Sequence, residues 1–112
     1  MKLPMLVDSS TTGLSDMQIS RILSVISSHP GVYQAILFGS RAMGTHRYGS
    51  DIDIALDGDD LTLEDLLRFH IVIDDLNLPF MVDLVHIQEI TNSDLIDHIK
   101  RVGKVLYCRD RV

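Results

Sequence analysis

The sequence predicts a small α/β or α+β domain in which a mixed β-sheet is covered by helices on one face. Its 112 residues fit one hydrophobic core and leave no room for a second, so we expect a single domain over residues 1–112. A hydrophobic content of 46% with 23% charged residues is ordinary for a globular chain. Along the chain, the apolar pattern changes between the period of helices and that of strands. The other face of the sheet is then free to carry the functional site.

The first part of the chain predicts a helix followed by a strand. Residues 1–13 show no sustained periodicity and are expected to form a loose leader that carries little function. Ser15 is a favourable N-cap, and apolar residues recur at helical spacing over residues 16–28. Residues 33–38 are β-branched and aromatic enough for a buried strand, which is expected to end at Gly39.

The middle of the chain predicts a second strand and a second helix. A short helical turn is expected over residues 41–43, and the polar stretch 44–50 is expected to form a loop. In the strand over residues 51–56, carboxylates alternate with large aliphatic side chains, so one face is acidic and the other apolar. Thr62 resembles the first residue of a capping box, and the helix that follows is expected to continue until Pro79.

The last part of the chain predicts a strand, a helix and a terminal edge strand. The apolar run over residues 80–87 has the length of a strand. Ser93 is expected to cap the last helix, which Gly103 ends. Residues 104–108 could then add a strand at the edge of the sheet.

Composition and charge exclude several classes of protein. No apolar run approaches the roughly 20 residues that span a bilayer, so we expect no membrane association, and the N-terminus lacks the pattern of a signal peptide. The single cysteine, Cys108, cannot form an internal disulfide, which fits the reducing cytoplasm. A net charge of −6 disfavours direct binding of nucleic acid, but a magnesium-bound nucleotide is compatible with it.

The informative motif consists of Gly39-Ser40, ten intervening residues, and then Asp51-x-Asp53. Successive side chains of a strand alternate between faces, so the two aspartates project to the same side with backbones about 7 Å apart. Asp83 interrupts the apolar run of the next expected strand, where an ionised carboxylate is costly unless it is paired or bound to a metal. If the two strands are neighbours, the three carboxylates form one site. Taken alone, the Asp-x-Asp pair is also compatible with a solvated acidic face.

Three carboxylates in this pattern favour magnesium as the metal. Two divalent cations about 3.5–4 Å apart need bridging oxygen ligands, which paired aspartates supply while positions stay open for phosphate oxygens and water. Zinc would require Cys or His ligands, and the five histidines show no ligand spacing. Asp83 would ligate one ion and help to deprotonate an attacking hydroxyl group.

Gly39 and Ser40 lie where a strand is expected to turn into a short helix, and exposed N–H groups at such a turn suit an anion. Gly39 allows close approach of the backbone, and the Ser40 hydroxyl can donate to a phosphate oxygen. Arg41 is a further candidate for contact with phosphate or pyrophosphate because its guanidinium is permanently charged. An ordinary surface ion pair is the alternative for Arg41.

The Gly-Ser pair, the Asp-x-Asp pair and the later aspartate together resemble the signature of the minimal nucleotidyltransferases, a group within the DNA polymerase beta superfamily. The matching residues are Gly39, Ser40, Asp51, Asp53 and Asp83. The resemblance covers most of residues 15–108 and implies a nucleotidyltransferase fold similar to the polymerase beta palm. Members of this family often carry a second basic residue two positions after the arginine of the motif, where this chain has Met43.

Several members of that family are antitoxins that move AMP from ATP to a tyrosine of a helical HEPN-type toxin. The resemblance implies the same role here, with ATP as substrate, two Mg²⁺ ions as cofactors and a HEPN-type toxin as partner. A homodimer is a further association to consider, because an edge strand and a small core favour docking. Two other functions stay open: a non-catalytic module that covers a partner, and adenylylation of a small molecule such as an aminoglycoside.

Overall fold

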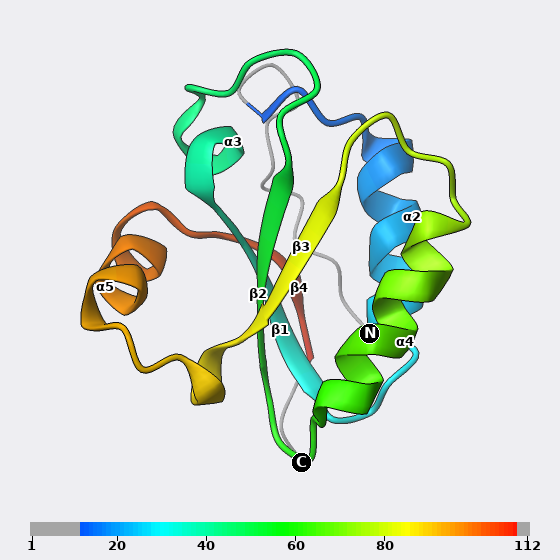
Figure 1. Ribbon diagram of the computed structural model, residues 1–112, viewed down its shortest axis with the longest axis vertical. Helices are drawn as coiled ribbons and strands as arrows, with labels where there is room; N and C mark the ends of the chain where they lie inside the picture. Colours follow the sequence, from blue (N-terminus) through cyan, green and yellow to red (C-terminus); the bar gives the residue numbers. More distant parts are fainter. Residues whose placement is uncertain (1–11, 110–112) are drawn as a thin grey trace.

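A computed structural model describes residues 12–109, in which a four-stranded sheet lies between helices on both of its sides (Figure 1). The elements in chain order are α2 (Asp16–Ile26), β1 (Val32–Phe38), α3 (Gly39–Met43), β2 (Ile52–Gly58), α4 (Leu63–Asp74), β3 (Val82–His86), the 3-10 helix η1 (Ile87–Glu89), α5 (Ser93–Val102) and β4 (Lys104–Cys108). The mixed α/β fold class is confirmed. No helix in this part of the chain has the length and apolar character needed to cross a bilayer.

The sheet has the strand order β3-β2-β1-β4. The central strand β1 runs antiparallel to β2 on one side and to β4 on the other. Strand β3 pairs with β2 in parallel, and α4 makes the crossover between these two strands. The expected terminal strand exists and forms one edge of the sheet, while β3 forms the other.

One face of the sheet carries the main core. Ile52, Ile54 and Leu56 of β2 are completely buried on this face, as the alternation of the sequence predicts. Helices α2 and α4 lie side by side over them (Figure 1). Their buried contributions to this cluster are Ile22, Leu23, Ile26, Phe69 and Ile73. Burial of these aliphatic and aromatic side chains is the main source of stability for this layer.

The opposite face is partly covered as well, which corrects the expectation that helices cover one face only. Ile99 of α5 packs against Phe38 and Ala55 in a second, smaller apolar cluster. Figure 1 shows α5 and α3 on the side of the sheet away from α2 and α4. The physical reason is that this face is itself partly apolar and needs cover. The surface available for a functional site is therefore the part of this face that α5 does not cover.

Capping residues set the ends of the helices. Ser15 begins α2 through a capping box, as expected. Thr62 likewise begins α4, but the helix ends at Asp74 and does not continue to Pro79. The reason is local: Asn77 has a φ of 54°, in the left-handed region that ends a helix.

The N-cap of α5 also differs from the prediction. Asn92, not Ser93, is the capping residue, and its side-chain oxygen accepts hydrogen bonds from the backbone N–H groups of Asp94 and Leu95 at 2.9 Å and 3.3 Å. Both residue types are good caps, so composition alone could not distinguish these adjacent positions. The position matters because it fixes where α5 begins.

The prediction of a loose leader over residues 1–13 falls mostly outside the described residues. Its last two residues are described, and Thr12 is completely buried. The Thr12 carbonyl accepts a hydrogen bond of 2.8 Å from Arg41, and its hydroxyl accepts one from the N–H of Leu14. The end of the expected leader is thus an ordered part of the structure that anchors α3.

The corrected cap yields a prediction for stability. We expect Asn92→Ala to lower the free energy of unfolding by about 1 kcal/mol, because two N–H groups of α5 lose their acceptor. Ser93→Ala is the matched control, and it should change the free energy of unfolding by a few tenths of a kcal/mol at most. Urea unfolding followed by circular dichroism measures both. A larger loss for the Ser93 variant would contradict the assignment of the cap.

Candidate functional site

Two of the three motif aspartates lie directly opposite each other on neighbouring strands. Asp53 of β2 is paired with Asp83 of β3 in the parallel register. Paired residues of parallel strands project to the same side of the sheet, and for these two it is the side that carries α5. Asp51 immediately precedes β2, two residues before Asp53. The structure thus brings the three carboxylates to one end of two adjacent strands.

The three carboxylates have different environments. Asp51 and Asp83 are exposed, whereas Asp53 is half-buried. Burial raises the pKa of Asp53, and the negative charges of Asp83 and Asp51 raise this pKa further. A positive charge on nearby His98 acts in the opposite direction when that ring is protonated. Ionisation of Asp53 therefore carries an electrostatic cost in the free protein, and a bound cation would relieve that cost.

The chemistry of this donor set fits magnesium, which the family resemblance implies. Within residues 12–109, no three His, Cys, Asp or Glu side chains converge closely enough to form a complete cation site in advance. Magnesium does not require such a cage, because it commonly binds through one or two carboxylates plus water and the phosphates of its substrate. The repulsion of Asp53 by Asp83 and Asp51 also favours a bound magnesium ion, because a cation would reduce that repulsion.

Gly39 packs directly against Asp53. It is the first residue of α3 and has a φ of 75°, in the region that favours glycine. A Cβ at this position would overlap the carboxylate of Asp53. The backbone conformation therefore favours glycine at this position, and any larger residue would have to displace the Asp53 carboxylate. Ser40 follows as the second residue of α3 and is half-exposed.

His98 belongs to this site, although no spacing in the sequence singled it out. Its Nε2 accepts a hydrogen bond of 3.1 Å from the backbone N–H of Gly39. Its ring also contacts Phe38 edge-on, with 6.1 Å between the ring centroids. His98 lies on α5, 59 residues after Gly39, so only the packing of α5 against α3 and β1 reveals its place.

Arg41 is buried and binds backbone carbonyl groups of two neighbouring segments. Its side chain is 4% exposed, and it donates hydrogen bonds to the carbonyl groups of Ser50 at 3.0 Å and Thr12 at 2.8 Å. Its guanidinium also lies over the ring of Phe80, 4.9 Å from the centroid. Burial lowers the pKa of Arg41. This residue fastens the loop before β2 to the residues before α2, and its expected contact with phosphate stays a prediction.

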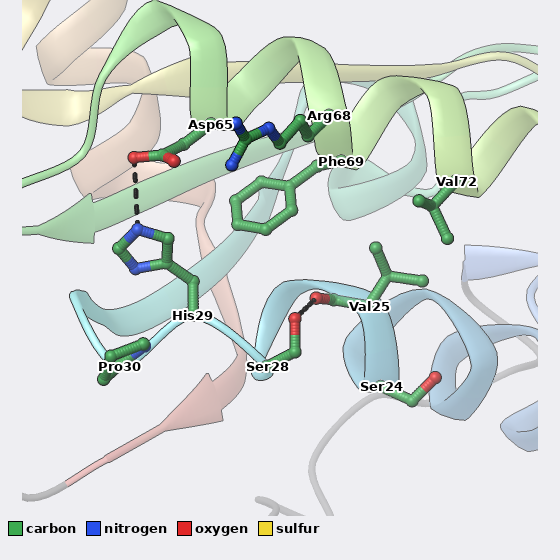
Figure 2. Close-up of a pocket in the computed structure, with 9 residues that line it drawn as sticks. All are labelled: Ser24, Val25, Ser28, His29, Pro30, Asp65, Arg68, Phe69 and Val72. Carbon is green, nitrogen blue, oxygen red and sulfur yellow. Dashed lines mark hydrogen bonds and ion pairs between the residues drawn. The ribbon is translucent and has the colours of Figure 1, made fainter.

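A separate hollow of about 490 Å³ lies between α2 and α4 (Figure 2). A hydrogen bond of 3.1 Å joins His29 and Asp65 at one end of it, and Phe69 and Val72 supply apolar lining. None of the motif residues borders this hollow. It lies against the two helices that cover the other face of the sheet, so it is not part of the carboxylate site.

The family model described as Polymerase beta, Nucleotidyltransferase matches residues 20–112. A crystal structure of a toxin–antitoxin with AMP-PNP contains a chain that is 26% identical, with 81% of this chain and 73% of that chain covered and a TM-score of 0.68. A mutant MntA–HpeT toxin–antitoxin complex contains a chain with 28% identity, coverage of 86% and 74%, and a TM-score of 0.66. A search of curated proteins finds no match.

A third solved structure shares the fold at lower identity. It is a tri-AMPylated Shewanella oneidensis HEPN toxin in complex with MNT antitoxin. The identity is 22%, the aligned region covers 86% of this chain and 74% of that chain, and the TM-score is 0.64. This likeness concerns the fold alone.

The close contact of Gly39 with Asp53 predicts the outcome of two glycine substitutions. Gly39→Ala and Gly49→Ala both place a Cβ on a residue with positive φ, at 75° and 79°. Gly49 has open space around it, so its variant should lose only about 1–2 kcal/mol from backbone strain. Gly39→Ala should lose more, and it should also bind Mg-ATP more weakly because Asp53 is displaced. Thermal unfolding and calorimetric titration measure these effects, and equal losses in the two variants would contradict the proposed contact.

The raised pKa of Asp53 predicts a gain in stability on neutralisation. The folded state holds the proton of the Asp53 carboxyl group more tightly than the unfolded state does. The free energy of unfolding therefore falls as the pH rises from 3.8, the ordinary pKa of Asp, through the raised pKa of Asp53 in the folded state. Asp53→Asn should therefore unfold a few degrees higher than the wild type at pH 7, with the difference vanishing in acid. Magnesium should stabilise the wild type but not this variant.

The control for this prediction is Asp59→Asn, which removes an exposed carboxylate from the turn after β2. It should show neither the gain in stability at neutral pH nor the loss of the magnesium effect. Differential scanning calorimetry between pH 3 and pH 8, with and without magnesium, compares the three proteins. A lower midpoint for Asp53→Asn at pH 7 would show that repulsion does not govern the site.

Proposed function

Because the chain belongs to the polymerase beta nucleotidyltransferase family, we propose that it transfers AMP from ATP to a hydroxyl group of a partner protein, a tyrosine of a HEPN-type toxin. The observation that carries the proposal is the pairing of Asp53 with Asp83 beside the turn at Gly39. The comparisons support the choice of reaction and partner. One related structure is a toxin–antitoxin with AMP-PNP, an analogue of ATP, and another contains an AMPylated HEPN toxin.

Asp51, Asp53 and Asp83 would hold two Mg²⁺ ions. When bound, magnesium would neutralise charge on the triphosphate and lower the pKa of the attacking hydroxyl group. Gly39 would allow the leaving pyrophosphate to approach the backbone closely, and the Ser40 hydroxyl would donate to one of its oxygens. Asp83, which is exposed, would receive the proton of the acceptor hydroxyl. The acceptor oxygen then bonds to the α-phosphorus as the bond to pyrophosphate breaks.

An acceptor on the surface of another protein fits the shape of this site. Asp83 lies on the edge strand β3, and both Asp51 and Asp83 are exposed. A large acceptor can therefore approach from the open edge without entering a deep pocket. The net charge of −6 disfavours nucleic acid as that acceptor. A reducing cytoplasm is the expected setting for this reaction. A homodimer that pairs through an open edge of the sheet is also compatible with the structure.

The proposal predicts a covalent product on the partner. When the wild-type chain is mixed with a HEPN-type toxin, ATP and magnesium, intact-mass spectrometry should show an increase equal to one or more AMP units on the toxin. Fragmentation should place AMP on tyrosine. Asp53→Ala should abolish the product, because the central carboxylate of the site is lost, whereas Asp59→Asn should retain it.

The same experiment distinguishes the alternative functions. Inhibition of the toxin with no increase in mass would contradict the transfer reaction and favour a non-catalytic protein that covers its partner. Transfer to an aminoglycoside in the absence of any protein partner would contradict the choice of acceptor. Circular dichroism of Asp53→Ala shows whether loss of transfer arises from loss of fold.

A further inference from the structure

Helix α3 begins without a capping side chain of its own. Phe38 occupies the N-cap position, and its side chain makes no capping hydrogen bond. The first N–H groups of a helix have no acceptor within the helix and must find one elsewhere. For Gly39, that acceptor is Nε2 of His98, at 3.1 Å. A side chain from α5 thus serves as the cap of α3.

The position of the His98 ring is fixed by packing around it. Its neighbour Ile99 is 7% exposed and belongs to the cluster with Phe38 and Ala55. The ring itself meets Phe38 nearly at right angles, with an interplanar angle of 80°. Accepting a bond at Nε2 requires the neutral ring with its proton on Nδ1. The side chain is therefore held by apolar contacts and oriented by one hydrogen bond.

This hydrogen bond acts on both parts of the candidate site. It orients the peptide between Phe38 and Gly39, which is the start of the turn that would hold phosphate. The same glycine packs against the carboxylate of Asp53, so a rotation of this peptide would also disturb the carboxylate. One imidazole thus connects the turn to the central aspartate.

We propose that His98 is a positioning residue for nucleotide binding: it holds the Gly39 turn in the conformation that receives the phosphates of ATP. The inference rests on the proposed function, since it names a further residue of that same site. His98 does not need to touch the reacting atoms for this role. Its contribution is to remove the cost of ordering the turn when the nucleotide binds.

Two substitutions separate the hydrogen bond from the packing of the ring. His98→Phe keeps a ring against Phe38 but lacks the acceptor. His98→Gln places an amide oxygen at a similar reach and can accept the same N–H. If the role is positioning through the hydrogen bond, glutamine should rescue the function and phenylalanine should not. A role in packing alone would give the opposite order.

The experiment measures binding of a magnesium complex of AMP-PNP by calorimetry, and transfer of AMP to the HEPN-type partner by mass spectrometry. His98→Phe should weaken nucleotide binding and raise KM for ATP about tenfold, with kcat within a factor of about two of the wild type. His98→Gln should remain within about twofold of the wild type in both. Hydrogen exchange of the Gly39 amide should be faster in His98→Phe only.

Three results would overturn the proposed role of His98. Wild-type affinity in His98→Phe overturns it, and so does a loss in His98→Gln equal to that in His98→Phe. Tighter binding in His98→Phe also overturns it, because the imidazole would then compete with phosphate for the Gly39 amide. If the wild type transfers no AMP, the proposed function fails, whereas binding of AMP-PNP and exchange of the amide still test the role of His98.

Discussion

The arrangement of the site depends on the parallel pairing of β2 with β3. This register sets Asp53 opposite Asp83, and the alternation of side chains along β2 then places Asp51 nearby. A shift of one residue in β3 would turn Asp83 to the face covered by α2 and α4 and would expose Val82. The core prevents that shift, because Val82 is 3% exposed and packs with Ile52 in the main cluster. Burial of apolar side chains on one face of the sheet thus fixes the positions of the carboxylates on the other face.

The repulsion among the carboxylates is tolerated because the rest of the sheet is well buried. Burial and the like charges of Asp83 and Asp51 raise the pKa of Asp53, which indicates that the fold loses some stability at this point. Such a cost is typical of sites that bind a cation or a charged substrate, since the ligand then repays it. The completely buried residues Ile54 and Leu56, on the same strand, show where the compensating stability arises.

The residues in and around α3 have two kinds of role: some line the candidate site, and others hold neighbouring segments in place. Gly39 and Asp53 face each other at the site, whereas Arg41, two residues further along the same helix, is buried among the carbonyl groups of Thr12 and Ser50. Met43, where related sequences often carry a basic residue, is 47% exposed. Neither position supplies a positive charge to the open side of the turn. Neutralisation of the phosphates would then fall mainly to the metal ions held by the carboxylates.

The sequence by itself determined the order of helices and strands, the buried face of β2, and the shared face of Asp51 and Asp53, because these follow from side-chain periodicity within short segments. The position of Asp83 opposite Asp53 depends on the parallel pairing of β2 with β3, which the tertiary structure supplies. Only the tertiary structure decided that α5 covers part of the second face, that Arg41 supports loops, and that His98 caps α3. These features depend on contacts between segments far apart in the chain, such as Gly39 with His98 and Arg41 with Thr12. Local patterns cannot encode them, since the direction in which a helix packs is selected by the complementary apolar surface that it meets.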